Sequence, residues 1–204
     1  MPEPAGDAAG AQRPVRVLVV AGSRRVPSFT RALCDAAAEA LAAAAAEVDR
    51  WDVGDPVLPL ADPAYHRDPR LHPDPDVVRL VAAADAADAL VLGTPVYHGS
   101  MSGVLKNLLD HLAIAQFVYK PASLVGHGGR VRNPQALEPL RLSLQSVLAV
   151  TLPTQVVTAM GDFDDEGRVA DPEILARLGR LAHELVVFTE STRPARDRLV
   201  ARYA

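Results

Sequence analysis

Hydrogen-bond donors gather in a short segment that follows the first apolar run of the sequence. Gly22, Ser23, Arg25 and Ser28 come directly after residues 15–21. Gly22 permits a tight turn, the serine hydroxyls and the guanidinium can donate hydrogen bonds, and the first turn of a following helix adds free amides. This combination suits a phosphate group. The alternative is an ordinary serine helix cap beside a surface arginine.

The glycine spacing in this segment narrows the kind of phosphate. Neither G-x-G-x-x-G nor G-x-x-x-x-G-K-[ST] occurs there, and these patterns are typical of pyrophosphate and nucleoside triphosphate sites. The sequence therefore favours the single phosphate of a mononucleotide.

Two later segments could contact the rest of such a ligand. Residues 94–100 offer backbone amides to a flat polar edge and an aromatic wall from Tyr97, although Tyr97 could also pack within an ordinary strand-to-helix turn. Gly126, Gly128 and Gly129 would bring bare backbone close to a planar ring, or else form a flexible glycine loop.

Hydrophobic periodicity predicts the elements that position these segments. Strands are expected at residues 15–21, 48–53, 89–92, 122–125 and 154–159, and helices at residues 28–46, 76–84, 101–112, 135–150 and 174–186. Strands that alternate with helices indicate an α/β domain with a parallel sheet and right-handed crossovers. Five strands fit a flavodoxin-like three-layer sandwich of order 2-1-3-4-5 better than a six-stranded dinucleotide fold, and the three segments then share the carboxyl edge of the sheet.

The chain is expected to form one domain with two tails. Residues 1–13 lack periodicity and are predicted to be disordered, residues 14–190 form the domain, and the arginine-rich residues 191–204 form a partly ordered tail. The proline-rich segment 54–75 is too long for a mere connector. We expect it to form a rim of the site, with Tyr65, His66 and His72.

Composition excludes several classes of protein. A chain of 204 residues, of which 49% are hydrophobic and 23% are charged, is expected to form one globular domain. Its net charge of −4 argues against a general nucleic-acid-binding surface. It has one cysteine, Cys34, so it cannot form an internal disulfide, and this fits a reducing compartment. No apolar run is long enough for a membrane span and no signal peptide is evident, so a cytoplasmic protein is expected.

Other catalytic chemistries find little support. There is no nucleophile elbow, Cys34 belongs to the apolar stripe of a helix and is expected in the core, and the histidines lack metal-ligand spacing. Asp162, Asp164 and Asp165 before Gly167 resemble a calcium loop only weakly, because the spacing and the final glutamate are missing, so a hairpin-like surface turn is expected. We predict neither a catalytic side chain nor a metal.

Three motifs occur in order along the chain and carry a family resemblance. They are Gly22-Ser23-x-Arg25-x-x-Ser28-x-x-x-x-Leu33, then Thr94-Pro95-x-Tyr97-x-x-Ser100-x-x-Gly103-x-Leu105-Lys106-Asn107-x-x-Asp110, then Gly128-Gly129. Together they resemble the NADPH-dependent FMN reductase family over about residues 15–188.

The resemblance implies where a non-covalent FMN would bind. It assigns the phosphate to Ser23, Arg25 and Ser28, helped by the amides of Phe29 and Thr30. It assigns the borders of the flavin ring to two sets of residues, namely Pro95, Val96, Tyr97 and His98, and Gly126, His127, Gly128 and Gly129. Family members often have asparagine where Thr30 and His98 stand. His98 would either place a titratable group near the flavin or act as a simple polar substitute.

The resemblance also implies an activity. NADPH, or NADH as the alternative, would transfer hydride to FMN without help from a side-chain acid or base, and the protein would position the two rings. The reduced flavin would pass to an oxygenase partner, such as a flavin-dependent monooxygenase, or serve a small-molecule acceptor. The alternatives are an FMN-bound quinone or azo reductase, a flavodoxin-like electron carrier, and a cofactor-free interaction protein. A homodimer or homotetramer built partly on the helix after the second motif is expected.

Overall fold

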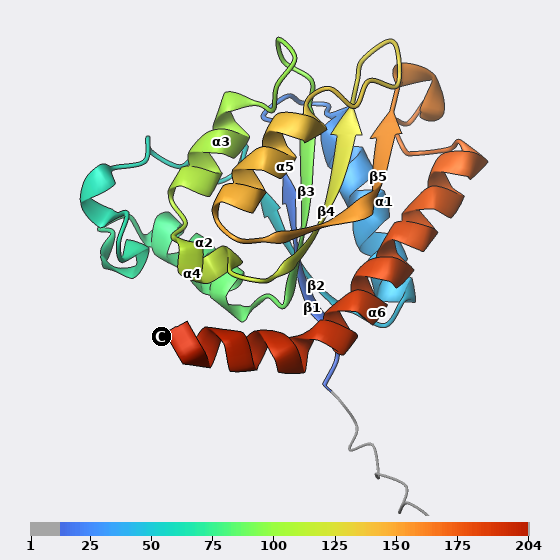
Figure 1. Ribbon diagram of the computed structural model, residues 1–204. Helices are drawn as coiled ribbons and strands as arrows, with labels where there is room; N and C mark the ends of the chain where they lie inside the picture. The colour runs from blue at the N-terminus through green and yellow to red at the C-terminus, as the bar shows by residue number, and fades with distance from the viewer. Residues whose placement is uncertain (1–12, 204) are drawn as a thin grey trace, which may run out of the picture.

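Five parallel strands form one sheet in the order β2-β1-β3-β4-β5 (Figure 1). The computed structural model describes residues 13–203, so the tail predicted at residues 1–13 lies outside the described residues except for Arg13. The strands are β1 (Arg16–Ala21), β2 (Glu47–Asp52), β3 (Ala89–Pro95), β4 (Pro121–His127) and β5 (Val150–Thr158). The predicted flavodoxin-like sandwich is confirmed.

Helices cover both faces of this sheet. One face carries α1 (Phe29–Ala43) and α6 (Pro172–Tyr203), and the other carries α2 (Pro75–Ala86), α3 (Gly103–Asp110), α4 (Ile114–Phe117) and α5 (Leu137–Ser146) (Figure 1). Three short 3₁₀ helices complete the described elements, namely η1 (Pro63–Tyr65), η2 (Pro69–Leu71) and η3 (Met160–Asp162). None of the helices in residues 13–203 combines the length and the apolar character that a membrane crossing requires.

Each face of the sheet has its own hydrophobic core. Along β1, Leu18 and Val20 pack with α2, α3 and α5, whereas Val17 and Val19 pack with α1 and α6. This is the alternation of side chains that a strand imposes. Every residue of the central strand β3 is buried, as expected for a strand covered on both sides.

Cys34 belongs to the core beneath α1, as predicted. Its side chain is 2% exposed, and burial strongly raises the pKa of the thiol. A Cβ atom at Gly93 would lie 2.1 Å from the Cys34 sulfur, so the close approach of α1 to β3 requires glycine at that position.

Three strands extend further than the periodicity indicates, and the first of them is β3, which continues past residue 92 to Pro95. Gly126 and His127 were expected in a loop, but they continue β4 and pair with Thr94 and Pro95 at the end of β3. Glycine and proline are normally signs of a strand boundary, and here pairing with a neighbouring strand overrides them. Similarly, β5 begins at Val150 instead of residue 154, which is compatible with Pro153 because β5 is an edge strand.

The C-terminal segment differs most from the expectation. Residues 191–203 do not form a partly ordered tail, because α6 continues through Pro194 to Tyr203. Figure 1 shows that α6 changes direction and that its last part runs beneath the amino ends of the strands. A proline lacks the amide that bonds to the preceding helical turn, which favours such a bend. Arg193 then reaches Asp88 at 3.2 Å, and Arg196 donates to the Val118 carbonyl at 3.3 Å.

Candidate functional site

The loop after β1 leaves the sheet against the end of β3. The Gly22 amide donates to the Gly93 carbonyl at 2.8 Å. A Cβ atom at position 22 would lie only 2.5 Å from that carbonyl oxygen, so the turn requires glycine. The next residue, Ser23, is 3% exposed, and its Oγ accepts a hydrogen bond from the Arg25 amide at 3.3 Å.

The same loop ends at the amino terminus of α1. Ser28 caps the helix, because its Oγ accepts from the Arg31 amide at 3.2 Å, and its hydroxyl hydrogen remains available to a ligand. The amides of Phe29 and Thr30 precede the first intrahelical bond, which runs from Ala32 to Ser28. The Thr30 side chain is buried, so only its amide can face a ligand there.

Two exposed cations accompany these donors. Within residues 13–203, neither Arg24 nor Arg25 forms an ion pair with a carboxylate, whereas Arg31, one turn further on, pairs with Asp52. Uncompensated positive charge, free amides and hydroxyls are the groups that a phosphate needs. The donor set therefore fits the phosphate of FMN.

The loop after β3 forms a tight hairpin beside the first loop. Tyr97 and Ser100 exchange two backbone hydrogen bonds of 2.9 and 3.0 Å. The two residues between them, His98 and Gly99, have φ angles of +50° and +78°, as in a type I′ turn. Asparagine tolerates this backbone conformation well, which gives a physical reason for the asparagine of the family. Tyr97 is 49% exposed and available as an aromatic wall.

Ser102 joins the first two loops and caps α3. Its Oγ donates to the Gly22 carbonyl at 2.6 Å and accepts from the Leu105 amide at 3.1 Å. Its amide donates to the Thr94 Oγ1 at 3.1 Å. Sequence reasoning did not include Ser102 among the site residues, because its role depends on a backbone carbonyl that is distant in the chain.

The third loop follows β4 and is held close to the first two. The Val96 amide donates to the His127 carbonyl at 3.1 Å. A Cβ atom at Gly128 would lie 2.2 Å from the Val131 carbonyl oxygen, so this position also requires glycine. Gly129 adopts a φ of +81° with open space around it, and its carbonyl accepts from the Met160 amide at 2.7 Å.

The ring of His127 lies at the α1 end of the site. It contacts Phe29 and Phe163 at centroid distances of 5.0 and 5.6 Å, and its Nδ1 lies 3.2 Å from the Thr158 Oγ1. Burial lowers the pKa of His127 below its usual range, and the Arg25 charge acts in the same direction while Asp162 opposes them.

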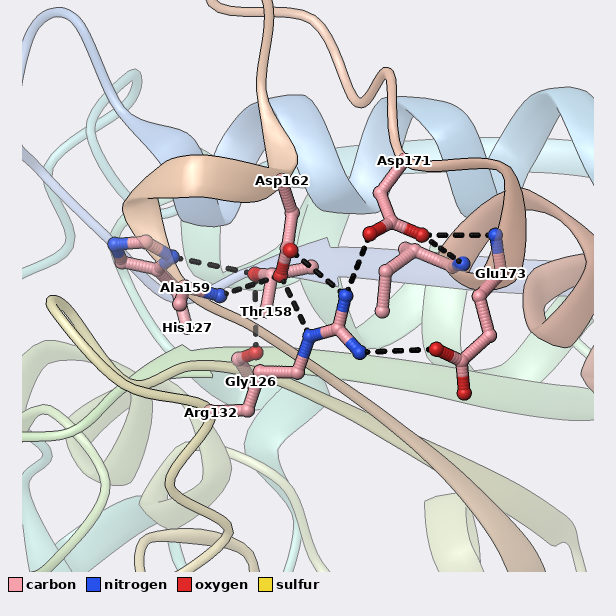
Figure 2. A network of polar contacts seen from close by, with 9 residues as sticks. Gly126, His127, Arg132, Thr158, Ala159, Asp162, Asp171 and Glu173 are labelled. Carbon is pink, nitrogen blue, oxygen red and sulfur yellow. Dashed lines mark hydrogen bonds and ion pairs between the residues drawn. The ribbon is translucent and has the colours of Figure 1, made fainter.

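Figure 2 shows a polar network beside this histidine. Arg132 donates to both carboxylate oxygens of Asp162, at 2.8 and 3.0 Å, and it also contacts Asp171 and Glu173. These bonds join the third loop to η3 and to the start of α6. The spacing in the sequence contained no signal for the network, because its members come from separate loops. The hairpin-like surface turn predicted for Asp164, Asp165 and Gly167 is confirmed, with Asp164 paired to Arg168. Asp162, which was predicted to belong to it, is buried and ends η3.

A cleft of about 700 Å³ opens beside the first two loops. Its lining residues come from the loop after β1, the loop after β3, the start of α3 and the segment 54–75, namely Arg24, Arg25, Tyr97, Ser102, Gly103, Val104, Asn107, Val57, Leu58 and Leu60. None of the residues 126–129 is among them. The size is typical of a site for a small organic molecule.

The proline-rich segment forms one wall of this cleft, with other residues than expected. The side chains of this segment that line the cleft are the apolar Val57, Leu58 and Leu60. Tyr65, His66 and His72 instead lie beside His111, with the His72 and His111 rings 5.4 Å apart. Asn107 of α3 fixes the wall, because it accepts from the Ala61 amide at 3.0 Å and donates to the Pro59 carbonyl at 2.7 Å.

The comparisons with known proteins agree with these features. The family model described as NADPH-dependent FMN reductase matches residues 15–163. An FMN-dependent NADPH-azoreductase of Staphylococcus aureus (strain USA300) is 33% identical over 179 residues, which cover 86% of this chain and 95% of that protein.

Two solved structures show the same fold. The flavoenzyme NAD(P)H:(acceptor) oxidoreductase FerB from Paracoccus denitrificans superposes with a TM-score of 0.71 at 21% identity, covering 87% of this chain and 98% of FerB. The apo form of the NADH:FMN oxidoreductase EMOB gives a TM-score of 0.64 at 23% identity, covering 82% of this chain and 88% of EMOB. From the family match and the azoreductase relative, we conclude that the chain belongs to the NADPH-dependent FMN reductase family, as an NAD(P)H-dependent oxidoreductase that uses FMN.

Proposed function

We propose that the three loops at the carboxyl edge of the sheet form the FMN site of this oxidoreductase. The phosphate lies between Ser23, Arg25 and Ser28 and the first amides of α1, those of Phe29 and Thr30. The observation that carries this assignment is the convergence of free donors with an arginine that has no carboxylate partner in residues 13–203. A carboxylate at this place would have argued against an anionic group.

The flavin ring then lies along the second and third loops. Pro95, Val96, Tyr97 and His98 border the ring, and the exposed side of Tyr97 supports this placement. At the polar edge, Gly128 donates its amide to the Thr158 carbonyl at 2.8 Å. Gly129 follows in the open φ > 0 conformation, so its backbone is the one best placed to approach the ring. Gly126 and the backbone of His127 contribute from the end of β4, where the His127 carbonyl accepts from the Val96 amide.

The residues of the chain position the reactants. When bound, FMN supplies the redox chemistry that carries electrons from the nicotinamide to an acceptor. The phosphate donors fix one end of the site. The hydrogen bonds that join Gly22 to Gly93 and Ser102 fix the distance between the first two loops. The cleft beside these loops leaves room for a second ring. Orientation of two rings provides rate enhancement without an acid or base.

We propose a flat, largely apolar acceptor such as an azo compound or a quinone. Val57, Leu58 and Leu60 give the cleft an apolar wall that suits such a molecule. The name of the Staphylococcus aureus relative supports an azo acceptor. A flavin-dependent monooxygenase that receives reduced FMN is the alternative. A homodimer or homotetramer and a cytoplasmic location stay predictions, and light scattering on the purified protein measures the first of these.

One spectroscopic experiment tests the proposed function. The purified full chain is examined for flavin absorbance, and NADPH is then added with and without free FMN. A yellow protein that NADPH bleaches rapidly supports an FMN-bound reductase, which is then assayed with an azo dye. A colourless protein that oxidises NADPH only with added FMN supports a flavin-supplying reductase. A yellow protein that does not react with NADPH would support an electron carrier, and absence of flavin affinity would refute the site.

A further inference from the structure

His127 is the side chain on which the loops of the site converge. It ends β4, its carbonyl accepts the Val96 amide of the second loop at 3.1 Å, and its ring contacts Phe29 at the start of α1. Phe163 from the segment after β5 packs against both rings, with centroid distances of 4.6 Å to Phe29 and 5.6 Å to His127. The imidazole is therefore fixed beside the helix terminus that donates to the phosphate.

The hydrogen bonds of Thr158 assign the neutral tautomer of this histidine. The Thr158 hydroxyl donates to the Gly126 carbonyl at 3.4 Å, so its oxygen is left to accept from the Nδ1–H of His127 at 3.2 Å. Since Nδ1 carries the proton in this arrangement, Nε2 is the basic nitrogen. In Figure 2, Nε2 points away from Thr158 and from the Arg132 network.

Two charged side chains have opposite electrostatic effects on the imidazole of His127. Arg25, in the loop after β1, disfavours a cation at His127, whereas Asp162, at the end of η3, favours it. The negative charge of Asp162 is largely compensated by Arg132, because the two side chains form a bidentate ion pair. Burial, together with the Arg25 charge, keeps the pKa of His127 below its usual range, which favours the neutral ring in the free protein.

A phosphate dianion beside Arg25 would reverse this balance. It offsets the arginine charge and attracts a cation at Nε2. We propose that His127 is a proton-linked member of the phosphate site, which takes up a proton at Nε2 when a phosphomonoester binds between Arg25 and the start of α1. The proton comes from solvent and stays on the imidazole, so no covalent bond forms. The inference rests on the proposed function, because the phosphomonoester is that of FMN.

Proton linkage gives this assignment a measurable consequence. A group that is protonated more in the complex than in the free protein makes binding tighter as the pH falls toward the bound-state value. The ratio of the wild-type FMN affinity to that of a variant without the imidazole should rise about fivefold to tenfold between pH 7.5 and pH 5.5. The phosphate of FMN also titrates in this range, so the difference between wild type and the variant, and not the pH dependence of wild type alone, measures the contribution of His127 to the coupled pair. Riboflavin, which lacks the phosphate, should show no such change.

The test is calorimetric titration of the full chain, freed of flavin, with FMN at pH 6.5 in two buffers of different ionisation enthalpy. The difference in heat measures the protons taken up on binding. We expect wild type to take up roughly half a proton more than His127→Asn, and His183→Asn, which removes an exposed histidine of α6, to behave as wild type. Riboflavin should give equal uptake with all three proteins.

Equal proton uptake on FMN binding by wild type and His127→Asn would overturn the inference. An excess uptake by wild type over His127→Asn that is as large with riboflavin as with FMN would also overturn it. If His127→Asn binds neither flavin, His127→Phe replaces it, since phenylalanine keeps a ring between Phe29 and Phe163. A pH dependence of FMN affinity in His127→Phe that equals that of wild type would also overturn the proposal, and a weaker dependence would support it. Absence of FMN binding by wild type would refute the proposed function itself, which is a different result from binding without proton uptake.

Discussion

Single glycines and serines set the distances between the loops of the site. Gly22 and Gly128 lie where a Cβ atom would collide with a backbone carbonyl oxygen, at 2.5 and 2.2 Å respectively. Ser102 then connects the first loop to the second through its bond to the Gly22 carbonyl. The absence of a side chain at the two glycines and the hydroxyl of Ser102 therefore fix the shape of the backbone, and this backbone would present its amides to the ligand.

Arg25→Ala should weaken FMN binding about 10- to 100-fold, because it removes a charge-assisted hydrogen bond to the phosphate. The guanidinium is exposed and makes no ion pair within residues 13–203, so the free energy of unfolding should change little. Fluorescence titration with FMN and thermal unfolding measure the two effects. Riboflavin affinity serves as the control and should be unchanged, and an FMN affinity equal to that of wild type would remove Arg25 from the phosphate site.

Gly128→Ala should distort the third loop. The new methyl group would meet the Val131 carbonyl oxygen and the Asn133 amide nitrogen, at 2.2 and 2.5 Å, and the backbone must move to relieve an overpacking that typically costs about 1–3 kcal/mol. We expect FMN affinity to fall on the order of tenfold. Gly161→Ala is the matched control, because its Cβ atom would meet nothing within 4 Å. Unchanged FMN affinity in Gly128→Ala would separate this loop from the flavin.

The ends of strands and helices position the loops of the proposed site, and hydrogen bonds from α3 hold the segment 54–75. The carboxyl ends of β1, β3 and β4 carry the three loops, and the start of α1 supplies free amides. The short helix α3 has a different task, because Asn107 and His111 bind the backbone of the segment 54–75 at Pro59 and Ala61. This helix therefore holds the apolar wall of the cleft in place.

Asn107→Ala should release the wall of the cleft without unfolding the domain. It removes two hydrogen bonds, of 3.0 and 2.7 Å, each of which contributes about 1 kcal/mol. Hydrogen exchange at the Ala61 amide should accelerate by an order of magnitude or more, and KM for an azo acceptor should rise severalfold. Lys106→Ala, which loses only an exposed ion pair with Asp110 on the same helix, is the control. An unchanged protection of Ala61 would contradict the anchoring role.

The two ends of the sheet have different roles: one carries the proposed site and the other carries contacts that stabilise the fold. The carboxyl edge of the sheet carries the site, and the amino edge is closed by the last part of α6 (Figure 1). There Arg13 and Arg193 pair with the buried Asp88, which also accepts the Arg16 amide at 3.0 Å. Lys120 lies at the same edge, 1% exposed, and donates to the Ala84 carbonyl.

Lys120 should make stability depend on alkaline pH. Burial, with a contribution from Arg196, lowers the pKa of Lys120 to about 8, so the folded protein loses this proton at a lower pH than the unfolded chain. Between pH 8 and about 10.5 the unfolded chain binds more protons, and stability therefore rises with pH by roughly 3 kcal/mol over the window.

Urea unfolding of wild type and Lys120→Met at pH 7.5, 9 and 10 measures this effect. We expect the free energy of unfolding of the variant to exceed that of wild type at pH 7.5, and the difference to shrink as pH increases. FMN affinity should stay unchanged, because Lys120 lies at the opposite edge of the sheet from the site. A constant difference across the three pH values would show that Lys120 is not the group that titrates.

The sequence alone predicted the sheet order, the helices on its faces and the three loops of the proposed site. Periodicity and turn residues are local properties, and the buried run of β3 and the apolar stripe after it can be recognised without knowledge of the partners. Cys34 could be assigned to the core for the same reason.

Only the tertiary structure decided the features that depend on distant segments. Gly126 and His127 join β4 because β3 offers them hydrogen-bond partners, and α6 continues past residue 190 because the amino edge of the sheet receives Arg193 and Arg196. The network of Arg132, like the anchoring of the cleft wall by Asn107, joins segments that carry no common pattern in the sequence. Such contacts arise when distant segments pack together in three dimensions, so local sequence patterns do not predict them.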